Sequence, residues 1–206
     1  APIVAEDLGV ITEDVVNLRE SINAPGMAVL QFAWGGDSQS PHLPHNMYEN
    51  SFCYPGTHDN QTTEGWFESL DEVTKLKLAY YAGISEAEGA AWGLIRLGMS
   101  GVSKACVFTM QDVQGLGDEA RMNTPGVADG NWAWRVGPPG IFSTYGPQAK
   151  GLSSLAICFD RVANERMINA ETCKSQSSET DNSQVAADDV SKDADSDCRE
   201  KRFFGI

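Results

Sequence analysis

The stretch FCYPGTHDN, residues 52–60, places an apolar run, a turn and a group of polar side chains in that order. Its apolar run at residues 52–54 predicts a short β-strand, and the Pro-Gly pair at 55–56 marks the end of that strand. His58 and Asp59 follow directly after the turn. Titratable side chains just past the carboxyl end of a strand are typical of the active-site edge of a parallel α/β protein.

The same order of strand and polar residues occurs at other places along the chain. We predict further strands at residues 3–5, 28–33 and 104–110, separated by stretches with helical periodicity. Strands that alternate with helices are typical of parallel βα units, so the fold class is predicted to be α/β. Four such units would make half of an eight-stranded barrel.

Helices are predicted between these strands from capping residues and from the spacing of apolar residues. One helix starts after Thr12, and two or three helices cover residues 62–99, one of them capped by Asp71. The predicted apolar faces are Val15, Leu18 and Ile22 in the first helix, and Val73, Leu76 and Tyr80 in the helix after Asp71. A capping box is predicted at Ser85 and Glu88.

The composition excludes several classes of protein. The formal net charge is −14, from 29 acidic and 15 basic residues, which would repel a phosphate-rich partner, so no nucleic acid is expected as a partner. No apolar run approaches the roughly 18 residues of a membrane span, so no membrane partner is expected either. The opening residues do not show the pattern of a targeting peptide. The five cysteines form no CxxC pair, which predicts reduced thiols in an intracellular or plastid compartment.

Carboxylates lie within a few residues of the end of three of the four predicted strands. Glu6 and Asp7 follow the first strand, Asp59 follows the third, and Asp112 follows the fourth. Because the carboxyl ends of parallel strands meet at one edge of the sheet, we expect these groups to converge there. Position alone leaves two interpretations open, since carboxylates at such an edge either carry out chemistry or cap helices and pair with arginines.

Six motifs in order resemble those of one enzyme family, the 4-α-glucanotransferases, also called amylomaltases or disproportionating enzymes, of glycoside hydrolase family 77. The resemblance covers residues 1–135, about two-thirds of the chain. The motifs are IVAEDLGVIT (residues 3–12), VLQFAWG (29–35), PHLPHN (41–46), YPGTHDNQTTEGW (54–66), MQDVQGLGDEARMNTPG (110–126) and GNWAWR (130–135).

This resemblance implies a fold and an activity. The fold would be the C-terminal half of a (β/α)8 TIM barrel, strands five to eight. The activity would be the transfer of α-1,4-glucan segments between maltooligosaccharides or starch-type glucans by a retaining mechanism. The resemblance implies no cofactor and no metal, and a plastid or cytoplasmic localisation.

Residue roles carry over motif by motif. Glu6 in AEDLG would be the acid/base and Asp59 in THDN the transition-state stabiliser, whereas His58, Asn60 and Trp34 would bind substrate. The nucleophile aspartate of the family would lie upstream of Ala1, so we expect this polypeptide alone to be inactive. A catalytically dead glucan-binding fragment or pseudoenzyme is the alternative function.

Two groups of residues keep other interpretations open. Phe32, Trp34, Tyr54 and Trp66 could stack on sugars or pack in the core. His42 and His45 form an HxxH pattern that, with His58, could hold a metal in a regulatory protein. Pro41 and Pro44 argue against the helix that such a pattern requires.

Three domains are predicted from the resemblance and the composition. Residues 1–135 would be the partial catalytic barrel, and residues 136–168 a divergent segment with a helix at 152–168. Residues 169–206 are almost entirely polar and would form a disordered acidic tail, because they cannot bury enough apolar area to offset the entropy lost on ordering.

Overall fold

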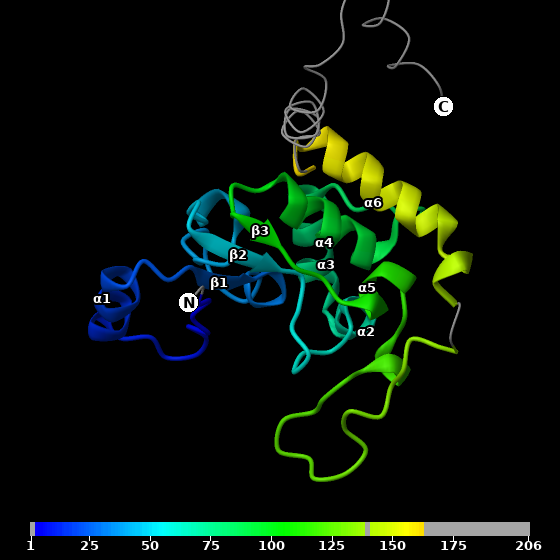
Figure 1. Ribbon diagram of the computed structural model, residues 1–206, viewed down its shortest axis with the longest axis horizontal. Coiled ribbons are helices and arrows are strands. Elements are labelled where there is room, and N and C mark those ends of the chain that lie inside the picture. The colour runs from blue at the N-terminus through cyan, green and yellow to red at the C-terminus, as the bar shows by residue number, and fades with distance from the viewer. Residues whose placement is uncertain (1–2, 139–140, 163–206) are drawn as a thin grey trace, which may run out of the picture. The chain divides into compact units, whose positions relative to one another are not determined.

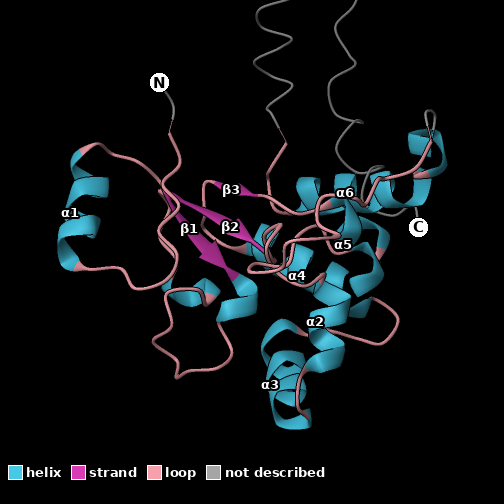
Figure 2. Ribbon diagram, turned by 90° about the horizontal axis from the view of Figure 1, so that it is seen from below, coloured by secondary structure: helices cyan, strands magenta, loops and turns pink. Residues whose placement is uncertain are grey.

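Three short parallel strands form the sheet in a computed structural model that describes residues 3–138 and 141–162 (Figure 1). The strands β1 (Gly26–Val29), β2 (Ser51–Tyr54) and β3 (Ala105–Cys106) pair in the order β1-β2-β3. All three point the same way in Figure 2, with Met27 opposite Phe52 and Cys53 opposite Cys106. The predicted α/β fold with a parallel sheet is confirmed.

The strand predicted at residues 3–5 is wrong, and two others are shorter than expected. Residues 3–8 have no regular secondary structure, and the Ala5 N–H makes one backbone hydrogen bond, 2.9 Å to the Pro25 carbonyl. The strand predicted at 28–33 ends at Val29, because the chain turns there into a 3-10 helix. The last strand stops early because Thr109 caps a helix.

Six α-helices surround the sheet within the described residues. They are α1 (Glu13–Ser21), α2 (Thr63–Ser69), α3 (Glu72–Ala82), α4 (Gly89–Ser100), α5 (Met110–Gln114) and α6 (Gly146–Cys158). Short 3-10 helices lie at Leu30–Phe32, Pro44–Asn46, Asp118–Ala120 and Ile141–Thr144. In that part of the chain, no helix is long and apolar enough to cross a membrane.

Local hydrogen bonds set several helix ends as the sequence predicts. The Asp71 carboxylate accepts from the Thr74 N–H at 2.9 Å. This hydrogen bond is the main reason that the pKa of Asp71 lies below its ordinary value. Gly83 ends α3 at a φ of 62°, a conformation that favours glycine. The capping box forms only in part: Ser85 Oγ accepts from the Glu88 N–H at 3.2 Å, but the Glu88 carboxylate pairs with Arg96 and α4 begins at Gly89.

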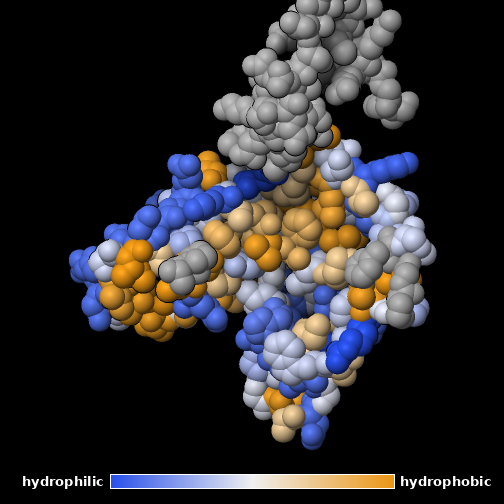
Figure 3. Space-filling model, in the orientation of Figure 1, coloured by the Kyte–Doolittle hydropathy of each residue, from blue (hydrophilic) through white to orange (hydrophobic). Residues whose placement is uncertain are grey.

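The apolar faces predicted for α1 and α3 are wrong. The three residues predicted to pack on α1 are 41–64% exposed, and those predicted on α3 are 59–89% exposed. On α3 the buried side chains are Leu78 and Ala82, and on α1 the buried side chain is Arg19. Figure 3 shows hydrophobic side chains gathered on the surface of α1. Figures 1 and 2 place α1 near β1 and away from α2–α6.

Helix α4 is the centre of the packing. Leu94 and Leu97 belong to one core cluster, which also holds Leu30, Cys53 and Leu78. Ile95 and Met99, also on α4, belong to a second cluster with Val113. Since eight of its twelve residues are buried, α4 joins the sheet to the helices around it.

Helix α6 covers the outer side of α4 (Figure 1). Its side chains Leu152, Leu155 and Ala156, with Phe159 just beyond, pack on the second cluster. The compact unit therefore continues to Val162. The helix lies earlier than the predicted 152–168, and residues 163–168 of that prediction, like the tail at 169–206, lie outside the described residues. The domain boundary at residue 135 stays a prediction.

Removing an apolar contact of α6 should weaken the folded unit. We expect Leu155→Ala to lower the free energy of unfolding by about 1–2 kcal/mol, because its half-buried side chain packs against α4. Ile157 lies on the same helix but is 66% exposed, so Ile157→Ala should stay within about 0.5 kcal/mol of the parent. Urea unfolding of both variants measures the difference, and equal losses would contradict the docking of α6.

Candidate active site

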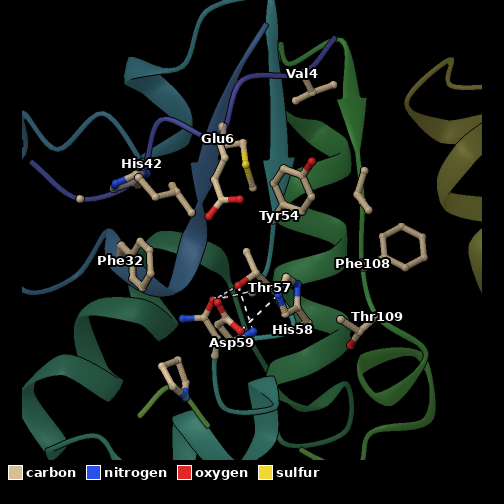
Figure 4. A pocket seen from close by; sticks show the side chains of 17 residues that line it. Val4, Glu6, Phe32, His42, Tyr54, Thr57, His58, Asp59, Phe108 and Thr109 are labelled. Carbon is tan, nitrogen blue, oxygen red and sulfur yellow. Dashed lines mark hydrogen bonds and ion pairs between the residues drawn. The ribbon is translucent and has the colours of Figure 1, made fainter. Parts of the chain in front are cut away.

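A cleft of about 1020 Å³ opens where the three strands end. Its walls come from the segments that follow each strand and from residues 4–9, which pass beside β1. Figure 4 shows Glu6 and Asp59 entering this cleft from opposite sides, with Tyr54, Phe32 and Phe108 around them. Two carboxylates predicted from the sequence to converge at the carboxyl edge of the sheet therefore line one cavity.

Glu6 is exposed in the cleft, and the carboxylate of its chain neighbour Asp7 is held outside the lining of the cleft. Asp7 Oδ1 accepts from the Met27 N–H of β1 at 2.7 Å, and its Oδ2 lies 3.4 Å from Arg19 Nη1. Arg19 in turn lies over the ring of Tyr48, 5.0 Å from the centroid. These contacts fasten the backbone of Glu6 to β1 and to α1 while leaving its own carboxylate free to meet a ligand.

Gly26 makes room for this anchor. A Cβ at Gly26 would lie 2.4 Å from both Arg19 Nη1 and Asp7 Oδ2, and 2.5 Å from the Tyr48 hydroxyl. Such distances are far below van der Waals contact, so any other residue at position 26 would displace the polar side chains that hold Asp7.

Asp59 is held from two sides. His58 Nε2 lies 3.2 Å from Asp59 Oδ1, and Asn123 Nδ2 donates to the same oxygen at 2.6 Å. Arg121 Nη2 donates to the backbone carbonyl of Asp59 at 2.9 Å. The Asp59 side chain still keeps 44% of its surface exposed, so it is oriented without being closed off.

Trp132 and Asn123 are site residues that the sequence reasoning missed. The indole of Trp132 lies 5.2 Å from the His58 ring, at an interplanar angle of 39°. The backbone N–H of Trp132 donates to the Met122 carbonyl at 2.7 Å. The backbone φ of Trp132 is 61°, which is unusual for a residue with a side chain. The only signal in the sequence was that the two residues belong to the motifs at 110–126 and 130–135.

Asn60 and Trp34, both predicted to bind substrate, have other partners. Asn60 lines the cleft, but its Oδ1 accepts from both the N–H and the hydroxyl of Thr57 at 2.8 Å, which closes the turn that carries His58 and Asp59. Trp34 is 4% exposed and packs edge-on to Tyr81 in the core. The assignment of Trp34 to substrate is therefore corrected to a core position. Phe32, 47% exposed, lines the cleft instead.

The histidines of the metal-binding alternative each have other partners. His42 Nδ1 accepts from the Val29 N–H at 3.1 Å, so this nitrogen carries no proton, and burial lowers the pKa of His42. His45 lies between the Tyr81 hydroxyl and the Ser38 carbonyl. Among the described residues, no group of three or more His, Cys, Asp or Glu side chains could hold a metal ion. The structure does not support that alternative.

Asp112 has a structural role. Its carboxylate is 2% exposed, and Oδ1 accepts from the Thr63 N–H at 3.1 Å, at the amino-terminal end of α2. Asp118 accepts from the preceding N–H of Thr62 at the same helix end. Both carboxylates satisfy backbone donors that a helix leaves unpaired, and they lie outside the lining of the large cleft.

The fold and the site define a parallel α/β protein with a carboxylate-lined cleft at the carboxyl ends of its strands. Residues 1–139 match the protein family described as 4-alpha-glucanotransferase. This chain belongs to that family, as its motifs predict.

Individual relatives agree with the family match. The chain is 48% identical over 160 residues to the chloroplastic/amyloplastic 4-alpha-glucanotransferase of Solanum tuberosum, covering 78% of this chain and 28% of that protein. It is 51% identical over 138 residues to the 4-alpha-glucanotransferase of Synechocystis sp., covering 66% of this chain and 27% of that protein. The chain thus spans less than a third of the length of these curated relatives.

A solved structure supports the fold independently. The amylomaltase from Streptococcus agalactiae in complex with acarbose superposes with a TM-score of 0.72 at 31% sequence identity. The match covers 77% of this chain and 32% of that chain. The described sheet and helices are therefore arranged as in a segment of an amylomaltase.

The half-buried His42 should make stability depend on pH. Its folded-state pKa is lowered from 6.5, so below about pH 6.5 the unfolded chain binds more protons and the free energy of unfolding falls. The negative charge of Asp7 opposes this effect but is the smaller influence. We expect His42→Asn, which keeps an acceptor for the Val29 N–H, to lose less stability between pH 7.5 and 5.5 than the parent chain.

Urea unfolding at the two pH values measures this difference. Gln39→Asn is the control, because Gln39 is exposed and carries no titratable group, so this variant should keep the parent's pH dependence. Equal pH dependence in the His42→Asn variant and the parent would show that His42 is not the titrating group.

Asp112 should matter for stability. We expect Asp112→Ala to lower the free energy of unfolding by about 1–3 kcal/mol, because the buried Thr63 N–H loses its acceptor. Asp112→Asn keeps an acceptor oxygen and should cost less. Asp129 is exposed in a loop, so Asp129→Ala should change stability by no more than about 0.5 kcal/mol. An Asp112→Ala variant as stable as Asp129→Ala would refute the capping role.

Proposed function

We propose that this chain is the C-terminal part of the barrel, strands five to eight, of a retaining 4-α-glucanotransferase that transfers α-1,4-glucan segments between maltooligosaccharides or starch-type glucans. In this proposal Glu6 is the acid/base and Asp59 the transition-state stabiliser. The observation that carries it is that these two carboxylates, each in its family motif, enter the same cleft.

The surroundings of Glu6 suit a group that must both give and take a proton. Breaking a glycosidic bond needs a proton on the departing oxygen, and the second half of the reaction removes one from the incoming sugar hydroxyl. The Glu6 carboxylate is exposed to the cleft, while its backbone is fixed through the buried contacts of Asp7. A proton can therefore pass to a bound sugar from a group whose position is already set.

Asp59 suits a different task. Hydrogen bonds that a carboxylate accepts from adjacent sugar hydroxyls favour the flattened, oxocarbenium-like ring of the transition state. Asn123 orients one carboxylate oxygen, and His58 lies between Asp59 and Trp132 with half of its own side chain exposed. His58 would donate to the same sugar. Phe32 and Tyr54, which line the cleft, could supply apolar surface for sugar rings.

The nucleophile of this reaction would come from the part of the enzyme that the present chain does not span. The proposal therefore concerns the complete enzyme, with a maltooligosaccharide or α-1,4-glucan as partner. The chloroplastic and bacterial relatives favour a plastid or cytoplasmic location for it. The alternative, a catalytically dead glucan-binding fragment or pseudoenzyme, shares the cleft but would not catalyse transfer.

A hybrid enzyme tests the proposal. The matching segment of the Synechocystis relative is replaced by residues of this chain, and maltotriose disproportionation is followed through glucose and longer maltodextrins. We expect the hybrid to be active, and Glu6→Gln to lower kcat by about 10²–10⁴-fold or more with the fold intact. Asp59→Asn should lower kcat far more than it raises KM, because the sugar contacts tighten in the transition state.

Glu13→Gln is the matched control, since Glu13 is exposed on α1 and outside the cleft. It should keep the activity of the unmodified hybrid. A Glu6→Gln hybrid with near-normal turnover would remove Glu6 from its role. A folded hybrid that binds acarbose but shows no transfer would favour the catalytically dead alternative.

A further inference from the structure

Two cysteines that are far apart in the sequence lie side by side in the sheet. Cys53 of β2 and Cys106 of β3 are direct partners in the parallel register. A Cβ added to Gly98 of α4 would lie 2.8 Å from Cys106 Sγ and 3.3 Å from Cys53 Sγ, so both sulfurs face the same point on α4. Neighbouring strands lie about 4.8 Å apart, within the range of Cα separations that a disulfide spans.

The two thiols differ in their surroundings. Cys53 is fully buried, whereas Cys106 is half-buried and lies nearer to solvent. Arg161 donates to the carbonyls of Met99 and Ser103, at 2.5 and 3.1 Å, and this holds its guanidinium at the end of α4 beside β3. Residue 161 lies beyond the family match at 1–139, so this positive charge comes from a segment outside that match.

These surroundings separate the acidities of the pair. Hydrogen bonding between the two sulfurs lowers the pKa of Cys106 and raises that of Cys53. Burial raises the pKa of Cys53 further. Burial opposes the lowering at Cys106, and the Arg161 charge lowers the pKa of both thiols. A thiolate is the form of cysteine that reacts with oxidants, so Cys106 is the sulfur that should react first.

We propose that Cys53 and Cys106 form an oxidation site, a dithiol that a peroxide converts reversibly to a disulfide between β2 and β3. The Cys106 thiolate attacks one oxygen of hydrogen peroxide, the O–O bond breaks, and hydroxide departs. Cys106 is then a sulfenic acid. Cys53 Sγ then attacks Cys106 Sγ, the S–O bond breaks, and water leaves with the Cys53 proton. Two electrons pass from the two sulfurs to the peroxide.

Such a bond would join two strands that end at the cleft. Tyr54 follows Cys53 directly, and Val107 follows Cys106, and both line the cleft. A covalent link here would restrict how far the two walls can separate. It would also close the chain between residues 53 and 106 into a loop, which stabilises the folded state by restricting the unfolded one.

Peptide mapping of the 206-residue chain tests the proposal. The other three cysteines, at 158, 173 and 198, are replaced by serine to prevent exchange. After reduction and then exposure to hydrogen peroxide, the chain is digested with trypsin without reductant. Cys53 and Cys106 fall in separate tryptic peptides, residues 20–75 and 105–121. We expect these peptides to be linked, at about 2 Da below their summed mass, and separated by dithiothreitol.

Two further measurements sharpen the test. The oxidised chain should melt several degrees above the reduced chain, with the difference abolished in Cys53→Ser. Arg161→Gln should slow loss of the Cys106 thiol several-fold, whereas Arg161→Lys, which keeps a positive charge, should retain most of the rate. Sulfinic acid at Cys106 with no linked peptide would overturn the proposal. If the Cys106 thiol were lost at the same rate in the parent, Arg161→Gln and Arg161→Lys chains, Arg161 would have no part in the oxidation.

Discussion

The burial of α4 against the sheet is the contact on which the rest of the structure depends. Leu94 and Ile95 are both fully buried but face different clusters, so one helix supplies the core on two sides. Each fully buried side chain of this kind contributes roughly 1.5–3 kcal/mol, so α4 contributes a large part of the stability. Gly93 and Gly98 let Ile84 and the sheet sulfurs approach the helix closely. The strands, and so the segments that line the cleft, take their positions from this helix.

Neighbouring carboxylates in this protein are separated in role by the hydrogen bonds that they accept. Asp7, which is partly buried, and Asp112, which is buried, each accept from a backbone N–H, and these bonds leave them little freedom to meet a substrate. Glu6 and Asp59 instead present their oxygens to the cleft. Asp7 nonetheless supports the site, because it holds the backbone of Glu6. Residue type and strand position alone do not reveal which of two adjacent acids is which.

The sequence predicted the parallel α/β class and the meeting of Glu6 with Asp59, because strand order and strand-end position are local properties of the chain. It failed where packing between distant elements decides the outcome. Leu78 is buried on α3 rather than Leu76, since the face that meets α4 depends on the path of the chain and not on periodicity alone. Trp34 packs against Tyr81, and Cys53 meets Cys106, across separations that no motif reports.

Arg161 also limits how far the chain can be shortened from its C-terminal side. Its guanidinium donates to three carbonyls at the end of α4, those of Met99, Gly101 and Ser103. A polypeptide trimmed to the limit of the family match at residue 139 would expose those carbonyls and the apolar side of α4 that α6 covers. The smallest piece that keeps the central helix intact is therefore longer than the segment that the family model matches. An expression boundary placed at the end of that match would remove a support of the core.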